Sequence, residues 1–185
     1  MMTEISLNVL DVAENSIRAG ASLVEISVIA DTKADCLTIT IKDDGHGMSE
    51  DQIAHVEDPF FTTRTTRKVG LGIPFFKQAA ESTGGTFSIT STQGVGTTVT
   101  AVFMLSHIDR MPLGDINSTI YTLITFNQQT DFLYTYSLDD RSFSLDTRQF
   151  KEVLGGVPFD TPEVSSYIKE YLDENKNEVS GNIIL

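Results

Sequence analysis

Two neighbouring segments that alternate apolar and polar residues most constrain the fold of this chain. Residues 23–30 and 36–41 each carry a β-branched or leucine side chain at every second position. These alternating residues are Val24, Ile26, Val28, Leu37, Ile39 and Ile41. A period of two is typical of strands that bury one face and expose the other. The alternation therefore predicts two half-buried strands at 23–30 and 36–41.

Helices and further strands are expected on both sides of this pair. An apolar stripe with helical spacing predicts a helix over 3–19, capped by Thr3 and ended by Gly20. Ser49 is expected to cap a short helix, and a longer helix over 71–82 should end at Gly84 and Gly85. Strands are predicted at 86–90 and 97–103. The first part of the chain thus mixes helices with strands.

The second part of the chain, residues 106–185, carries none of the glycine-rich motifs of residues 1–105. The two parts are therefore interpreted as separate units: residues 1–105, which carry the motifs, and a small α+β region at 106–185 of unassigned role. Strands are predicted in the second part at 119–126, 132–137 and 143–145. A last helix is expected to begin at Thr161-Pro162, and the tail after Asn175 is expected to be mobile.

Charge and cysteine usage exclude several classes of protein. The 185 residues include 13 Lys and Arg against 26 Asp and Glu, a formal net charge of −13. Such a chain should repel a phosphate backbone, so no nucleic-acid partner is expected. No apolar run approaches the ~18 residues of a membrane span, so no membrane association is expected. Cys36 cannot form an internal disulfide and is predicted to be a reduced core thiol of a cytoplasmic protein.

Four motifs in a fixed order carry the chemistry. They are Asp11-Val-Ala-Glu14-Asn15-Ser-Ile-Arg18; Asp43-Asp44-Gly45-His46-Gly47-Met48; Asp58-Pro59-Phe60-Phe61-Thr62-Thr63-Arg64 leading to Gly70-Leu71-Gly72; and Gly94-Val-Gly96-Thr97-Thr98. One short glycine motif is weak evidence, whereas four in this order between the expected elements are strong. Over residues 3–105 the chain resembles the GHKL ATPases, which include gyrase, heat-shock chaperones, mismatch-repair ATPases and histidine kinases. The third and fourth motifs are most similar to those of the histidine kinases.

The resemblance implies a fold and a ligand. The fold is an α/β sandwich, the Bergerat fold, in which one mixed sheet has helices on one face and ATP lies between helices and sheet. Asn15 is implied as the ligand of Mg²⁺, since an amide oxygen suits a shell shared with phosphates and water. Arg18, one turn further on, matches a basic residue of the kinases and is interpreted either as a phosphate contact or as a surface charge.

Adenine recognition is assigned to the second and fourth motifs. The resemblance gives Asp43 the hydrogen bond from the adenine amino group, a bond that a guanine carbonyl could not donate. Gly45 and Gly47 would let the backbone pass close to the base, and Met48 completes this set. Thr97 is implied to hold the adenine through water. No role is assigned to His46.

The third motif is assigned to the phosphates. Gly70, Leu71 and Gly72 precede a helix, whose free N–H groups and dipole favour an anion. Lys68 stands where the family usually has a further glycine. Arg64, Arg67 and Lys68 form the basic cluster of an acidic chain, and the sequence does not decide which of them contacts phosphate. Phe60 is expected either to pack the lid or to belong to the core.

Asp11 raises the question of catalysis. Hydrolysing members of the family have a glutamate at this position as general base, and histidine kinases generally lack it. Aspartate is shorter by one methylene, so Asp11 is either a catalytic base or a solvated acid. The chain is interpreted as a Mg-ATP module that hydrolyses ATP or transfers its γ-phosphate to a partner protein, like an anti-sigma serine kinase. The alternative is a regulatory module that senses ATP without turnover.

A phosphoacceptor histidine is a weaker possibility. Residues 106–113 faintly echo the phosphoacceptor motif of histidine kinases, with His107 as the candidate. The acidic residue of the motif stands one place late, at Asp109, and the segment follows the ATPase-like part. A linker leaving the last strand of the first part is the preferred interpretation of this segment.

Overall fold

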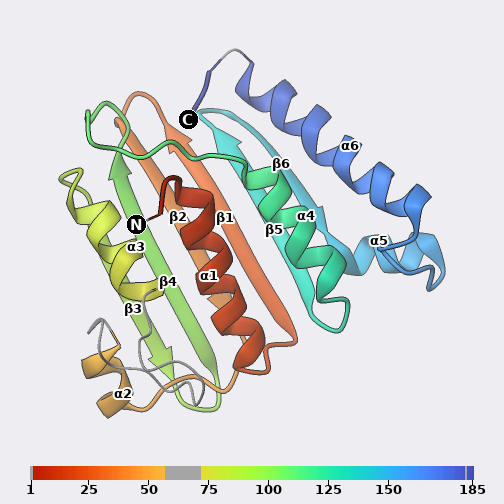
Figure 1. Ribbon diagram of the computed structural model, residues 1–185, viewed down its shortest axis with the longest axis horizontal. Helices are drawn as coiled ribbons and strands as arrows, with labels where there is room; N and C mark the ends of the chain where they lie inside the picture. Colours follow the sequence, from red (N-terminus) through yellow and green to blue (C-terminus); the bar gives the residue numbers. More distant parts are fainter. Residues whose placement is uncertain (1, 57–71, 182) are drawn as a thin grey trace.

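The computed structural model describes residues 2–56, 72–181 and 183–185. In these ranges helices cover one face of a single sheet (Figure 1). The strands are β1 (Leu23–Asp31), β2 (Cys36–Asp43), β3 (Thr86–Thr92), β4 (Gly96–Met104), β5 (Asp131–Leu138) and β6 (Arg141–Asp146). The helices are α1 (Ile5–Arg18), α2 (Glu50–His55), α3 (Gly72–Glu81), α4 (Ile116–Phe126), α5 (Thr147–Leu154) and α6 (Pro162–Ser180).

The sheet is mixed, with the strand order β3-β4-β2-β1-β5-β6. Every neighbouring pair is antiparallel except β1 and β5, which run parallel. The mixed sheet confirms the predicted α/β sandwich. Because β5 pairs with β1, the sheet runs without a break from the 1–105 part of the chain into the 106–185 part.

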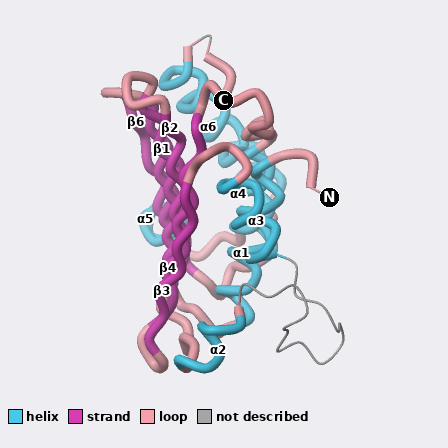
Figure 2. The backbone as a smooth tube through the Cα atoms, turned by 90° about the vertical axis from the view of Figure 1, so that its left-hand side faces the viewer, coloured by secondary structure: helices cyan, strands magenta, loops and turns pink. Residues whose placement is uncertain are grey.

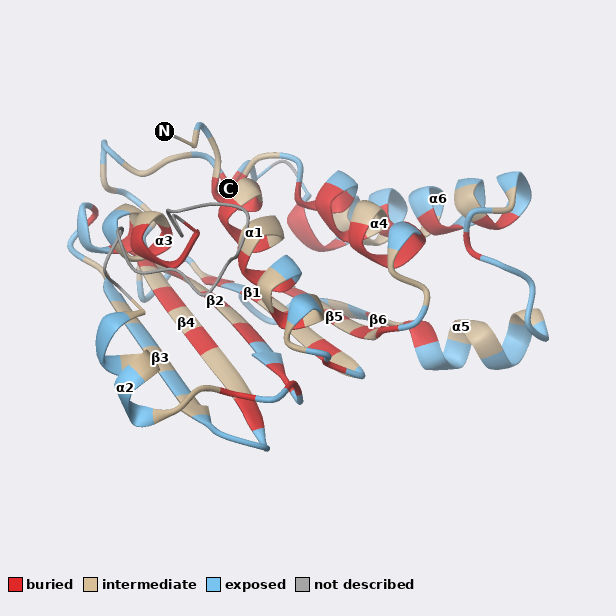
Figure 3. Ribbon diagram, turned by 60° about the horizontal axis from the view of Figure 1, so that its bottom comes forward, coloured by how far each residue is buried: buried red, intermediate tan, exposed pale blue. Residues whose placement is uncertain are grey.

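Two layers make up the molecule. Helices α1, α3 and α4 lie on one side of the sheet, and α5 reaches the other side at the β6 margin (Figure 2). In β1, β2, β4 and β5 the strand residues that face the helices are mostly buried, whereas their neighbours are exposed or half-buried (Figure 3). The six alternating residues predicted from the sequence are each at most 2% exposed, which confirms both the two strands and the face that they bury.

The segment predicted as a strand at 119–126 is helical instead, because it is α4. Its β-branched and aromatic residues favour a strand by propensity. However, Ile116, Ile120 and Leu123 recur at helical spacing and are at most 1% exposed between α1 and β5. The Asp115 side chain accepts from the Ser118 amide and caps the helix. Burial of this stripe outweighs the local preference.

The predicted cap of α1 is also wrong. The helix begins at Ile5, and Glu4 occupies the N-cap position without a side-chain cap bond. Instead, the Ile5 amide donates to the Pro112 carbonyl at 3.0 Å and the Ser6 amide to the Leu113 carbonyl at 2.9 Å. Backbone more than a hundred residues away thus satisfies the first free donors of α1.

Two further predictions also fail. The residues after Asn175 continue α6 to Ser180, where Val179 is 4% exposed and the Ser180 hydroxyl pairs with Tyr136. Cys36 is half-buried, and its side chain lies on the sheet face opposite the helices. It is therefore not part of the core.

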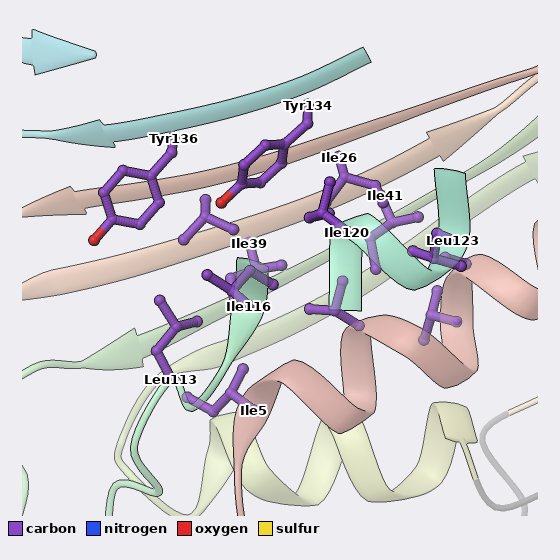
Figure 4. Close-up of a cluster of buried hydrophobic side chains, with 14 of the residues drawn as sticks. Ile5, Ile26, Ile39, Ile41, Leu113, Ile116, Ile120, Leu123, Tyr134 and Tyr136 are labelled. Atoms are coloured by element: carbon purple, nitrogen blue, oxygen red, sulfur yellow. The ribbon is translucent and has the colours of Figure 1, made fainter. Parts of the chain in front are cut away.

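Two tyrosines of β5 stand side by side on the helix-covered face of the sheet (Figure 4). The Tyr136 hydroxyl lies 2.8 Å from the Ser180 hydroxyl. The Tyr134 side chain is fully buried, and its hydroxyl has no hydrogen-bond partner among the described residues. Burial, followed by the neighbouring Tyr136, raises the pKa of Tyr134 well above its ordinary value. The two hydroxyls therefore differ in what they contribute to stability.

Tyr134→Phe is expected to raise the free energy of unfolding by about 1 kcal/mol, because it removes a buried hydroxyl that is unpaired. Tyr136→Phe should lower it by about 1 kcal/mol, because it breaks a bond and leaves Ser180 unpaired. Urea denaturation of the two variants beside the parent measures both changes. Equal destabilisation by the two substitutions would contradict the assignment.

Candidate functional site

Asp43, the last residue of β2, is the centre of a hydrogen-bonded group. Its side chain is buried, with 9% exposure. The carboxylate accepts from the Ser16 hydroxyl at 2.5 Å, from the Gly45 amide at 2.9 Å and from the Thr97 amide at 3.3 Å. Three parts of the chain, α1, the turn after β2 and β4, thus meet at one carboxylate.

These bonds leave acceptor capacity on Asp43. Oδ2 takes the bond from Ser16, and Oδ1 takes the two backbone amides. A carboxylate offers about four acceptor positions, so one position is left for a further donor. A buried carboxylate with one remaining acceptor position suits a ligand that presents an N–H group.

The glycines around Asp43 occupy positions where a side chain would collide. A Cβ at Gly45 would lie 2.9 Å from the Ala19 Cβ and 3.0 Å from an Asp43 oxygen. Gly47 has a positive φ of 66°, and a Cβ there would lie 2.1 Å from the Thr92 carbonyl. The turn therefore packs directly against the end of α1 and the end of β3, as a close backbone approach requires.

Ser91, which the sequence analysis missed, connects the second and fourth motifs. Its hydroxyl accepts from the Met48 amide at 2.8 Å and donates to the Gly96 carbonyl at 3.0 Å. The Thr97 hydroxyl lies 2.8 Å from it and must be the donor of that pair, because the Ser91 proton is already used. Met48 and Thr97 are therefore held together through one serine.

Asp44 fixes the turn from its other side. Its carboxylate accepts from the backbone amides of Ser22 and Leu23 and from the Ser22 hydroxyl. Partial desolvation, the largest single effect, acts to raise the pKa of Asp44, but these hydrogen bonds together outweigh it and lower the pKa. Asp44 thus serves the loop and not the pocket around Asp43.

The α1 face beside α3 carries the predicted metal and base residues. Asp11 and Asn15 lie one turn apart, and a Cβ at Gly72 would lie 3.5 Å from an Asp11 oxygen and 3.8 Å from the Asn15 amide nitrogen. Gly72 is the first residue of α3. The N-terminus of α3 therefore lies directly against Asp11 and Asn15, so the first and third motifs meet in the fold.

Arg18 shares the face of Asn15, as predicted. Its guanidinium donates to the Asn15 amide oxygen at 2.9 Å and lies 3.6 Å from Glu14. About half of the Arg18 side chain is exposed, so it contributes charge at the surface of the site. The amide oxygen that the resemblance assigns to Mg²⁺ is thus engaged by a cationic donor in this structure.

Five predicted site residues lie outside the described residues. They are Phe60, Arg64, Lys68, Gly70 and Leu71, all within 57–71. Their assignments stay predictions, and so does the choice among Arg64, Arg67 and Lys68. In the ranges that are described, no cluster of three or more His, Cys, Asp or Glu residues could hold a metal ion.

His107 lies at the far end of the sheet from Asp43. It follows β4, which begins beside Asp43 and ends at Met104. Seven residue steps from Thr97 to Met104 span about 24 Å in a strand. The structure therefore places His107 beyond the opposite end of β4 from Asp43 and does not bring the two residues together.

Comparison with known proteins identifies the family. Residues 3–107, more than half of the chain, match the model of the histidine kinase-, DNA gyrase B- and HSP90-like ATPases. The chain belongs to this ATPase family. The match covers Asp11, Asn15, Asp43 and Thr97, together with the described residues that surround them.

Relatives of this ATPase module include bacterial sensor proteins. The chain is 36% identical over 85 residues to the C4-dicarboxylate transport sensor protein DctB of Pseudomonas aeruginosa. The matched region makes up 45% of this chain and 14% of that protein. It is 32% identical over 99 residues to the sensor histidine kinase ZraS of Escherichia coli. Here the matched region makes up 54% of this chain and 20% of that protein. The chain thus matches only a small part of each.

A solved structure shares the fold. It is described as the N-terminal domain of a DNA repair protein and superposes with a TM-score of 0.56 at 17% identity, over 78% of this chain and 52% of that one. This likeness supports the α/β fold alone. Among the helices that the structure describes, none is long and apolar enough to cross a membrane.

Ser16→Ala is expected to lower the free energy of unfolding by about 1.5–3 kcal/mol, because it removes a hydrogen bond to a buried carboxylate. Ser22→Ala is the matched comparison, because the Ser22 hydroxyl also bonds to a carboxylate, that of Asp44, but at the exposed surface. It should lower the free energy of unfolding by less than half as much. Chemical denaturation of both variants measures the difference. Equal costs would show that the Ser16 bond to Asp43 has no special weight.

Proposed function

We propose that this chain binds Mg-ATP and hydrolyses it, or transfers its γ-phosphate to a partner protein in the manner of an anti-sigma serine kinase. The observation that carries the proposal is the buried Asp43 carboxylate, with three protein donors and one acceptor position left. Membership in the ATPase family supports the choice of nucleotide.

Adenine recognition follows from the chemistry of Asp43. The exocyclic amine of adenine donates a hydrogen bond, whereas the corresponding guanine group is a carbonyl that only accepts. A carboxylate held by Ser16 and two backbone amides cannot turn away to accommodate the wrong base. The proposed specificity for adenine thus depends on both the residue and the bonds that orient it.

The phosphates would extend from Asp43 toward the N-terminus of α3. Gly72 begins this helix beside Asp11 and Asn15, and the free amides and dipole of a helix start attract an anion. Asn15 fits a metal ligand because its amide oxygen is a hard donor next to this helix start. Bound Mg²⁺ would neutralise phosphate charge there. Arg18 would have to release the Asn15 oxygen and could then face the phosphates.

Asp11 is the proposed catalytic residue of both enzymatic forms. It is half-buried and lies against Gly72, so its carboxylate is on the side of α1 that faces the proposed phosphate position. There it would orient a water molecule or the hydroxyl of a partner protein and accept its proton. Within the proposal, the acceptor alone distinguishes an ATPase from a protein kinase.

One observation favours a non-catalytic alternative. Residues 106–185 add β5 and β6 to the edge strand β1, and the Pro112 and Leu113 carbonyls cap α1. A change of nucleotide at α1 could therefore reach this second part of the chain directly. In that case the chain would signal its nucleotide state through protein contacts, without measurable turnover.

Asp43→Asn is expected to weaken ATP binding by about 10- to 150-fold, because it removes a hydrogen bond to a charged group. GTP binding should not fall in parallel, since the new amide can donate to a guanine carbonyl. Calorimetric titration with both nucleotides measures the two affinities. Unchanged ATP affinity in a folded variant would reject the adenine assignment.

Asp11→Asn is expected to reduce hydrolysis or transfer by about 10²–10⁴-fold while leaving ATP affinity unchanged. Asp11→Glu keeps a carboxylate and should retain turnover. ATP labelled at the γ-phosphate separates release into water, transfer to a protein and neither. If the parent shows neither with Mg²⁺ present, the sensing alternative replaces the enzymatic proposal.

A further inference from the structure

The sheet face opposite the helices carries hydroxyl side chains in register across every strand. The pairing of the strands aligns one residue from each into a row that crosses the sheet. The central row is Ser88, Thr100, Thr40, Ser27, Thr135 and Ser144, in the order of the strands. All of its members are Ser or Thr, so the middle of this face has only short side chains.

The two flanking rows extend this hydroxyl face, a name used below for the three rows together. One row is Thr86, Val102, Thr38, Ile29, Ser137 and Ser142. The other is Thr90, Thr98, Lys42, Glu25, Leu133 and Asp146. Long charged side chains lie mostly on protein surfaces. The hydroxyl face has few of them, and they stand in one row.

Each charge on the hydroxyl face has a partner. Lys42 bonds to Glu25 at 2.9 Å across β1 and β2, and Asp146 bonds to Arg148 at 2.8 Å. Next to the rows, Asp131 bonds to Lys151 at 2.6 Å. Because these acids and bases balance, the three rows carry no net charge when Arg148 is counted with Asp146, on a chain of net charge −13. Asp31, one row further along β1 on the same side, adds a single acidic group at the margin.

The polar groups of the hydroxyl face also partly satisfy one another. The hydroxyls of Thr40 and Thr100 lie 3.4 Å apart, as do those of Thr135 and Ser144. Ile29, in one of the rows, exposes 42% of its surface. Removing this face from water therefore costs less than removing a charged face of the same size.

We propose that the hydroxyl face binds a second copy of this chain, so that two sheets pack back to back with the helices outside. Two copies of net charge −13 repel each other, and this neutral face is where they can approach with the least repulsion. Short side chains allow the ~10 Å spacing of packed sheets.

The size of the face agrees with a stable dimer. Six strands at ~4.8 Å spacing and three rows at ~6.8 Å spacing give a footprint of roughly 600 Å² per copy. Stable protein interfaces bury about 600–1,000 Å² per partner. In the described residues only α5 reaches this side of the sheet, at the β6 margin, so the remaining width is open (Figure 2).

The proposed dimer is independent of the nucleotide site. Asp43 belongs to the residues of β2 that face the helices, as do Leu37, Ile39 and Ile41, whereas Thr40 faces the other way. Two copies packed through the hydroxyl face would therefore keep both nucleotide sites on the outside. If no dimer forms, the proposed ATP binding is unaffected. If ATP does not bind, the proposed dimer is likewise unaffected.

Sedimentation velocity of the full chain between about 1 and 100 µM tests the proposal, a range chosen because interfaces of this size start at micromolar affinity. A concentration-dependent dimer is expected. Added salt should strengthen it, since salt screens repulsion between acidic copies. Thr40→Lys, in the centre of the face, should weaken association by about 10-fold or more, because it inserts an unpaired charge.

Ser166→Lys is the matched control, because it makes the same charge change at an exposed position of α6. It should leave the dimer intact, or strengthen it slightly by reducing repulsion. Circular dichroism checks that Thr40→Lys folds. If it does not fold, Ser144→Lys, at the exposed margin of the same row, replaces it.

The single cysteine provides a second measurement. Cys36 stands on the same side of the sheet, two residues before Thr38 on β2, and is half-buried. Its reaction with a maleimide should slow as the protein concentration rises through the dimer range, and should not slow in Thr40→Lys. A monomer at every concentration, or a dimer that Thr40→Lys leaves unchanged, would overturn the proposal.

Discussion

The hydrogen bonds to the Asp43 carboxylate determine how the parts of the nucleotide site stand relative to one another. A buried carboxylate is costly unless donors surround it, and here the donors come from α1, the turn after β2 and β4. Satisfying this one group therefore fixes α1 against the sheet. Asn15 precedes the donor Ser16 directly, and Asp11 lies one turn earlier. The proposed metal, base and adenine positions follow from the same bonds.

The second part of the chain supports the helix that carries these residues. Its β5 pairs with β1, and its α4 packs against α1 in the helix layer. The linker carbonyls of Pro112 and Leu113 accept from the first amides of α1. Helix α1 is thus held at one end by the linker and at the other by Asp43.

Much of the fold could be predicted from the sequence because its signals are local. The alternation in β1 and β2, the Ser49 cap of α2 and the glycine that ends α1 each depend on neighbouring residues. The predictions that were wrong concern features that depend on residues far apart in the sequence. Helix α4 has the composition of a strand and is helical because Ile116, Ile120 and Leu123 cover β5 and α1. The cap of α1 and the order of the tail come from contacts between residues far apart in sequence.

The sequence by itself determined the family, the order of the motifs and the residue types at the nucleotide site, because recurring chemistry needs the same side chains at the same spacing. Only the tertiary structure decided that Ser16 and Ser91 bind the motifs together, since a serine in a helix or strand carries no signal of its partner. It also decided that hydroxyl residues from six strands form rows on one face. Strand order and register create those rows, and both depend on which distant segments pair.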